Sequence, residues 1–133
     1  MVEPYINFQG RANEAMDFYE SVFNGTNKKV MAFSDMPADL NSPVPDHMKN
    51  WVGHGEMTIR GTVFNFSDTQ PDTVIGGMVS LMIRFDTFEE VADTYNKLTD
   101  GGEALMELMP QFYAKAFAWV RDKFGVDWQL ICE

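Results

Sequence analysis

The feature that most constrains the fold of this chain is an internal repeat, because two segments offset by 76 residues carry the same pattern. In each segment, apolar residues recur at the spacing of one helical stripe. The first stripe is Ala12, Ala15, Met16, Tyr19 and Val22, and the second is Phe88, Val91, Ala92, Tyr95 and Leu98. Gly25 and Gly101 occupy equivalent positions after the stripes, where a left-handed residue commonly ends a helix. The chain is therefore predicted to contain two copies of one helical unit.

Segments of alternating polarity, typical of strands, surround both predicted helices. They comprise residues 3–8, 28–34, 52–60 and 62–67 in the first half and 78–85, 103–108, 115–121 and 127–132 in the second. Arg60-Gly61 predicts a tight hairpin, Gly125 a turn, and Thr87 with Glu90 a capping box. The order strand, helix and three strands thus occurs twice, which predicts an α+β fold of two βαβββ modules.

The length of 133 residues and the apolar fraction of 45% suit a single domain with one shared core. We expect module one at about 1–68, a linker at 69–77 and module two at about 78–133. Residues 35–50 contain three prolines and predict a long loop. This loop is interpreted either as a lid or as a structural excursion.

The formal charge of −10 argues against some classes of partner, because such a chain repels phosphate backbones and anionic lipid heads. We therefore expect neither nucleic acid nor a membrane as partner. No apolar run approaches the roughly 20 residues of a membrane helix. The single cysteine, Cys132, cannot form an internal disulfide and alternates with apolar neighbours, which predicts a core residue and favours a cytoplasmic location.

Several stretches resemble the vicinal oxygen chelate superfamily of glyoxalases, bleomycin-resistance proteins and dioxygenases, and specifically its PhnB-like branch. They are Pro4-Tyr5-Ile6-Asn7-Phe8, Glu14-Ala15-Met16-Asp17-Phe18-Tyr19 with Val22-Phe23, His54-Gly55-Glu56-Met57, Val79-Ser80-Leu81, Glu89-Glu90-Val91 and Asp122-Lys123-Phe124-Gly125-Val126-Asp127-Trp128. The resemblance implies a cupped mixed sheet in each module, a helix on its convex face and a domain-swapped-type homodimer. Members often carry a ubiquinone-pathway methyltransferase label, but this sequence has no glycine-rich turn between strand and helix that would cradle a nucleotide-like cofactor.

Strand alternation predicts which side chains point away from the helices. If Ile6 and Phe8 lie under the first helix, Tyr5 and Asn7 take the opposite face, as do Ser80, Met82 and Arg84 in the second module. His54 and Glu56 share one face of their strand and are the predicted catalytic pair. They are interpreted as a general base with its orienting partner, as two metal ligands, or as a structural hydrogen bond.

The resemblance also implies where a metal would bind, because active metal-dependent relatives take His or Glu ligands from the first strand of each module and from the last strand. This sequence offers Glu3 or Tyr5, then Val79 or Ser80, and finally Gln129 where relatives carry a glutamate. Neutral amides and hydroxyls bind transition metals poorly. We therefore expect no family-type metal site and no cofactor.

The remaining candidates suit an apolar pocket or, alternatively, core and dimer contacts. They are Phe112, Tyr113, Trp119, Met82 and Met106, which join Tyr5, Asn7, Ser80 and Gln129 as predicted binding residues. His47, the second histidine, is predicted to be a surface residue. Two hypotheses follow. The first is a metal-independent protein that binds a small, partly apolar molecule, and the second is a lyase or isomerase in which His54 and Glu56 transfer a proton, with or without a metal bound in an altered arrangement.

Overall fold

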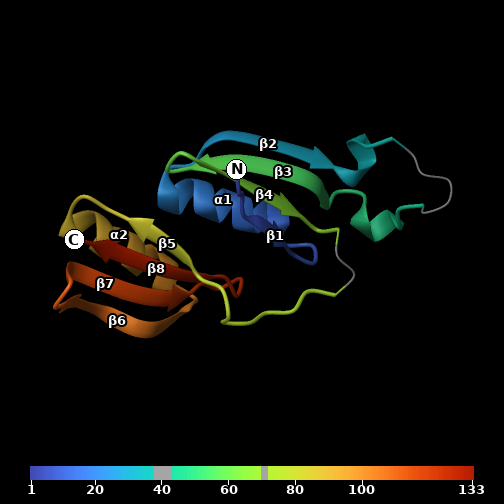
Figure 1. The fold of residues 1–133 in the computed structure, drawn as a ribbon. Helices are drawn as coiled ribbons and strands as arrows, with labels where there is room; N and C mark the ends of the chain where they lie inside the picture. The colour runs from blue at the N-terminus through green and yellow to red at the C-terminus, as the bar shows by residue number, and fades with distance from the viewer. Residues whose placement is uncertain (38–42, 70–71) are drawn as a thin grey trace. The chain divides into compact units, whose positions relative to one another are not determined.

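The element order strand, helix and three strands occurs twice in the computed structural model, which describes residues 1–37, 43–69 and 72–133 (Figure 1). The chain divides into two units, Met1–Thr73 and Val74–Glu133. The first contains β1 (Tyr5–Asn7), α1 (Ala12–Phe23), β2 (Thr26–Ala32), β3 (Val52–Ile59) and β4 (Thr62–Ser67), with short 3-10 turns at Phe33–Asp35 and Asp46–Met48. The second contains β5 (Leu81–Arg84), α2 (Phe88–Thr99), β6 (Glu103–Gln111), β7 (Ala114–Arg121) and β8 (Asp127–Cys132).

Each unit folds into one four-stranded mixed sheet with a single helix against one face (Figure 1). The strand orders are β1-β4-β3-β2 and β5-β8-β7-β6. In both sheets the first strand pairs in parallel with the last, and the other pairs are antiparallel. The predicted α+β fold of two βαβββ modules is confirmed. Part of the predicted loop 35–50 lies outside the described residues, as does part of the linker 69–77.

The buried stripe of α1 packs on the apolar face of the first sheet. Tyr19 is fully buried and stacks on Phe66 of β4 with ring centroids 6.1 Å apart. Gly55 brings the helix close, because a Cβ there would lie 2.6 Å from Sδ of Met16. Met57 is also fully buried. The helix therefore covers one face, and polar residues of the same strands are left on the other.

The second unit repeats this arrangement around Trp128, which is fully buried. Its indole Nε1 donates to Oδ2 of Asp122 over 2.8 Å, so the one polar atom of the indole is satisfied inside the core. Asp122 also accepts the backbone N–H groups of Phe124 and Val126, which forms the predicted turn before Gly125. Cys132 is 1% exposed, so its predicted place in the core is confirmed.

The hairpin and helix ends predicted from local sequence signals form in the structure, with one exception at the end of α1. Arg60 and Gly61 both have positive φ, at 48° and 84°, as a two-residue hairpin with the favoured twist requires. The Thr87 hydroxyl accepts the N–H of Glu90 over 3.2 Å, which confirms the N-cap of α2. Gly101 is left-handed as expected, but Gly25 is not, because Asn24 takes that conformation at the end of α1 with φ 54°. Gly25 is instead needed for its close approach to the Met57 side chain.

Strands β1 and β5 are shorter than the predicted segments 3–8 and 78–85. The prediction was too long because side chains alternate along any extended backbone, whether or not its peptide groups pair with a neighbour. Neither described helix has the length and apolar character that crossing a lipid bilayer requires.

Candidate ligand-binding face

The face of the first sheet that points away from α1, here called the open face, carries a polar row across all four strands. Lys29 pairs in register with Glu56, Glu56 with Asn65, and Asn65 with Tyr5. Residues paired in this way project from the same face. The row therefore places an ammonium, a carboxylate, an amide and a phenol side by side.

His54 and Glu56 form the chemical centre of this face. His54 Nε2 lies 3.2 Å from Glu56 Oε1, and each side chain is 41% exposed. The ring of Tyr5 lies 6.1 Å from the imidazole, tilted by 51°, and is itself 48% exposed. The carboxylate orients the imidazole, while both groups and the phenol remain open to a bound molecule.

Two further hydrogen-bonded groups border the pair. Asn65 Nδ2 donates to Oε1 of Glu3 over 3.1 Å and to the carbonyl of Pro4 over 3.3 Å, which fixes the amide beside Glu56. Ser67 Oγ donates to Oδ1 of Asn7 over 2.9 Å. Since this bond occupies the amide oxygen of Asn7, its NH₂ group is oriented to donate elsewhere.

The structure brings Tyr5, Asn7, His54 and Glu56 together, as strand alternation predicted. Sequence reasoning missed Asn65 and Ser67, although a signal was present. Both alternate with Phe64 and Phe66 in a strand whose boundaries were predicted correctly, so the same parity argument places them on the open face. Lys29 was missed because its place on the open face depends on the irregular pairing of β2 with β3.

In the second unit, the face away from α2 collects four other predicted residues. Gln129 pairs in register with both Met82 and Trp119, and its Nε2 donates to Ser80 Oγ over 2.9 Å. The indole N–H of Trp119 is buried and has no hydrogen-bond partner among the described residues. Two of these four side chains, Met82 and Trp119, are apolar.

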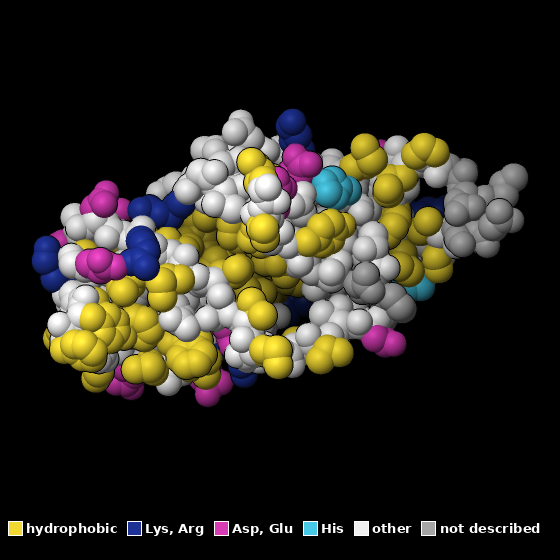
Figure 2. Space-filling view, in the orientation of Figure 1, with side chains coloured by type: hydrophobic (Ala, Val, Ile, Leu, Met, Phe, Trp, Pro, Cys, Tyr) yellow, Lys and Arg dark blue, Asp and Glu magenta, His cyan; other side chains and the backbone are white. Residues whose placement is uncertain are grey.

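Phe112 and Tyr113 occupy the turn between β6 and β7, away from the row that contains Gln129. Phe112 is 99% exposed and meets Tyr113 edge to face at 5.0 Å between ring centroids. Figure 2 shows apolar side chains gathered over this part of the second unit. The exposed or half-exposed apolar side chains of β6 and this turn, here called the apolar patch, are Met106, Met109, Phe112 and Tyr113.

An ion pair lies at the other end of β7. Arg121 Nε donates to Oδ1 of Asp127 over 2.7 Å, and its Nη2 donates to Oδ2 over 3.0 Å. The hydrogen bond with Asp127 and the charge of that carboxylate raise the pKa of Arg121 above its ordinary value. This bidentate contact fixes both side chains and removes Arg121 as a free anion site.

A family model described as 3-demethylubiquinone-9 3-methyltransferase matches residues 1–131. The chain belongs to this family. A curated relative, protein YjdN of Escherichia coli strain K12, is 25% identical over 136 residues, which cover 97% of this chain and 92% of that protein. Membership in the 3-demethylubiquinone-9 3-methyltransferase family states that the proteins are related in sequence. The described turns that lead from strand to helix, residues 8–11 and 85–87, contain a single glycine, Gly10.

Solved structures extend the comparison. Protein PA1353 from Pseudomonas aeruginosa is 30% identical with a TM-score of 0.82, covering 100% of this chain and 97% of its own. A putative 3-demethylubiquinone-9 3-methyltransferase, the PhnB protein from Bacillus cereus, is 30% identical with a TM-score of 0.79, covering 99% and 98%. The fosfomycin resistance protein FosX from Listeria monocytogenes shares the fold at 11% identity and a TM-score of 0.67, covering 100% and 92%. The chain is thus a PhnB-like protein with a glyoxalase/bleomycin-resistance-like fold.

One FosX variant in this comparison was solved with Mn(II). Within residues 1–37, 43–69 and 72–133, no three His, Cys, Asp or Glu side chains are grouped closely enough to hold a metal ion. Gln129 uses its amide to donate to Ser80, and Met82 is its neighbour on β5. These neutral groups do not fit a divalent transition metal.

Proposed function

We propose that this chain binds a small, partly apolar molecule on the open face of the first sheet, through hydrogen bonds and without a family-type metal. The observation that carries the proposal is the half-exposed trio of Tyr5, His54 and Glu56, in which the imidazole contacts both the phenol ring and the carboxylate. Ligand sites combine apolar surface with a few fixed polar groups. A phenol ring beside an oriented imidazole and a carboxylate provides that combination.

Exposure distinguishes a binding role from a purely structural one. A hydrogen bond that only holds the fold together is worth most when both partners are buried, because water then cannot replace either of them. His54 and Glu56 are each 41% exposed, and the core beneath them is closed by Met57 and other apolar residues. The pair therefore adds little to folding and is available to a ligand.

The test uses the two histidines of the chain as a matched pair. A library of small carbonyl, hydroxyl and aromatic metabolites is screened by thermal shift against the full chain, and a ligand at one hundred times its Kd should add about 2.7 kcal/mol of stability. His54→Ala should abolish the stabilisation, whereas His47→Ala, a change at the exposed histidine of the 3-10 turn Asp46–Met48, should preserve it. Loss of binding in both variants, or in neither, would contradict the assignment to this face.

A second function, a lyase or isomerase, is favoured by the 3.2 Å contact between His54 Nε2 and Glu56 Oε1. A carboxylate that orients an imidazole is the arrangement of a general base, which would remove a proton from carbon next to a carbonyl group. Each compound that binds is incubated in D₂O with the protein, and exchange of its C–H hydrogens is followed by NMR. Wild type should catalyse the exchange, and His54→Ala and Glu56→Gln should not. Binding without any exchange would leave the chain a binding protein.

We further propose membership in the vicinal oxygen chelate superfamily and a homodimer. The first is supported by the fold shared with FosX and by the duplicated βαβββ order. The second is supported by the apolar patch of the second unit, since large exposed patches usually mark contact surfaces. Light scattering coupled to size exclusion should give twice the mass of 15.2 kDa, and Phe112→Ser with Met109→Ser should shift it toward one chain. A single-chain mass for the wild type would exclude the dimer.

A further inference from the structure

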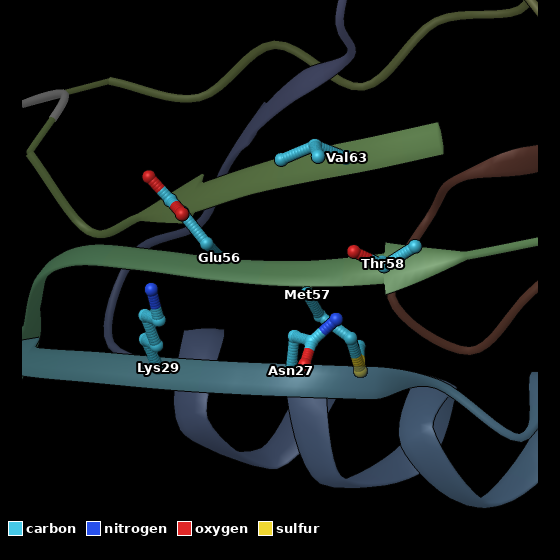
Figure 3. Close-up of a pocket in the computed structure, with 6 residues that line it drawn as sticks. All are labelled: Asn27, Lys29, Glu56, Met57, Thr58 and Val63. Carbon is cyan, nitrogen blue, oxygen red and sulfur yellow. The ribbon is translucent and has the colours of Figure 1, made fainter. Parts of the chain in front are cut away.

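A hollow of about 240 Å³ lies between β2 and β3, next to Glu56 (Figure 3). Its lining residues are Asn27, Lys29, Glu56, Met57, Thr58 and Val63. In Figure 3, Lys29 extends from β2 toward β3, while Glu56 extends over β4 and away from Lys29. The hollow is thus part of the open face, but its polar groups differ from those around His54.

The hollow contains several hydrogen-bond donors that have no side-chain partner among the described residues. The ammonium of Lys29, the amide of Asn27 and the hydroxyl of Thr58 form no side-chain hydrogen bond or ion pair with any residue that the structure describes. Glu56, the one carboxylate in the lining, is engaged with His54 instead. A positive charge flanked by two neutral donors favours an anionic oxygen group.

The backbone of β2 is shaped to produce this arrangement. Thr26 pairs with Thr58 and Lys29 with Glu56, so three steps along β2 match two steps along β3, which defines a bulge. Asn27, inside the bulge, has φ 55°, a conformation that costs most residues about 1 kcal/mol or more and that Asn tolerates better than most residues other than glycine.

The bulge decides where the two neighbouring lysines point. Lys28 reaches the helix side and pairs with Asp17 and Glu20 of α1. Lys29 is thereby left on the open face opposite Glu56. Bulges often occur next to functional sites, where they redirect a side chain.

We propose that this hollow is a subsite for the carboxylate or phosphate group of the bound molecule, with Lys29 as its charged anchor. The inference rests on the proposed binding function and narrows it to a small organic anion. Asn27 and Thr58 would donate to the remaining anionic oxygens, and Val63 supplies an apolar wall. A hydroxyl or amine next to the anionic group would then reach Glu56 in the adjoining row.

Two simple anions and a neutral analogue test the subsite, namely glycolate, inorganic phosphate and ethylene glycol. Binding to the full ¹⁵N-labelled chain is followed from the amide resonances of β2 and β3. Either anion should give saturable shifts and ethylene glycol should not. A response to glycolate alone assigns a carboxylate ligand, and a response to phosphate alone assigns a phosphate ester.

Lys29→Gln should weaken anion binding about tenfold or more, because a charge-assisted contact is lost. Lys28→Gln is the matched control, since it removes the same charge one residue away on the other face, and its affinity should stay within about twofold of wild type. Asn27→Gly retains the positive φ while deleting the amide, and it should weaken binding without disturbing the fold.

The outcomes separate the two proposals. If neither anion saturates the wild type, or if both lysine variants lose affinity equally, the subsite is refuted. If a neutral compound nevertheless binds in a manner that requires His54, the proposed function stands without the subsite. If neither anions nor library compounds bind, both proposals fail together.

Discussion

Asp68 provides the sharpest test of how the first unit is held together. This carboxylate, at the end of β4, is 1% exposed and accepts three backbone N–H groups. Its Oδ1 accepts from Gly10 over 2.8 Å and from Ala12 over 3.2 Å, and its Oδ2 accepts from Val52 over 2.9 Å. One side chain therefore joins the start of α1, the start of β3 and the end of β4.

The expected cost of Asp68→Ala follows from these three donors. Each N–H left without an acceptor costs about 1–3 kcal/mol, so the loss of three acceptors should lower the free energy of unfolding by roughly 3–9 kcal/mol. That loss is comparable with the total stability of many domains, about 5–15 kcal/mol. Asp68→Asn should cost less, because an amide oxygen can still accept from Gly10 and Ala12 while its NH₂ group opposes the N–H of Val52.

Urea unfolding followed by far-UV circular dichroism and by tryptophan fluorescence measures these differences. Asp72→Ala is the control, because Asp72 is exposed and its substitution changes the net charge equally, and we expect a change within about 0.5 kcal/mol. The reasoning would be refuted if Asp68→Ala cost less than about 1 kcal/mol, or if Asp68→Asn cost as much as Asp68→Ala.

Substitutions at three further positions test packing and capping by the same unfolding assay. Thr87→Ala should lower stability by about 1 kcal/mol through loss of the N-cap of α2, and Thr87→Ser should restore most of it, an expectation that fails if the two variants are equal. Gly55→Ala should cost about 1–3 kcal/mol, because the new methyl group would lie 2.6 Å from the flexible Met16 side chain. Gly102→Ala should cost more, since its methyl group would lie 2.7 Å from the backbone oxygen of Leu98 and 2.6 Å from that of Arg121. A larger loss of stability in Gly55→Ala than in Gly102→Ala would contradict this expectation, because it would mean that the backbone moves more readily than the Met16 side chain.

Much of the candidate site was predictable because alternation along a strand is a local property. Parity assigned Tyr5 to the face away from the helix and His54 and Glu56 to one shared face of their strand, and the same rule would have added Asn65 and Ser67. Strand parity does not predict the distances between side chains on the same face. The 3.2 Å contact between His54 and Glu56 depends on their rotamers, and the 6.1 Å approach of the Tyr5 ring depends on the parallel pairing of β1 with β4.

The sequence by itself determined the duplicated βαβββ order, both buried helical stripes and the bounds of β4 and β8, because each of these depends on the period of apolar residues along a short segment. Only the tertiary structure decided the bulge at Asn27, which turns Lys29 toward the open face, and the role of Asp68, which gathers donors from residues far apart in the chain. The physical reason is that a bulge and a buried cap each require a partner segment, and the strand that supplies the partner becomes a neighbour only when the sheet has formed.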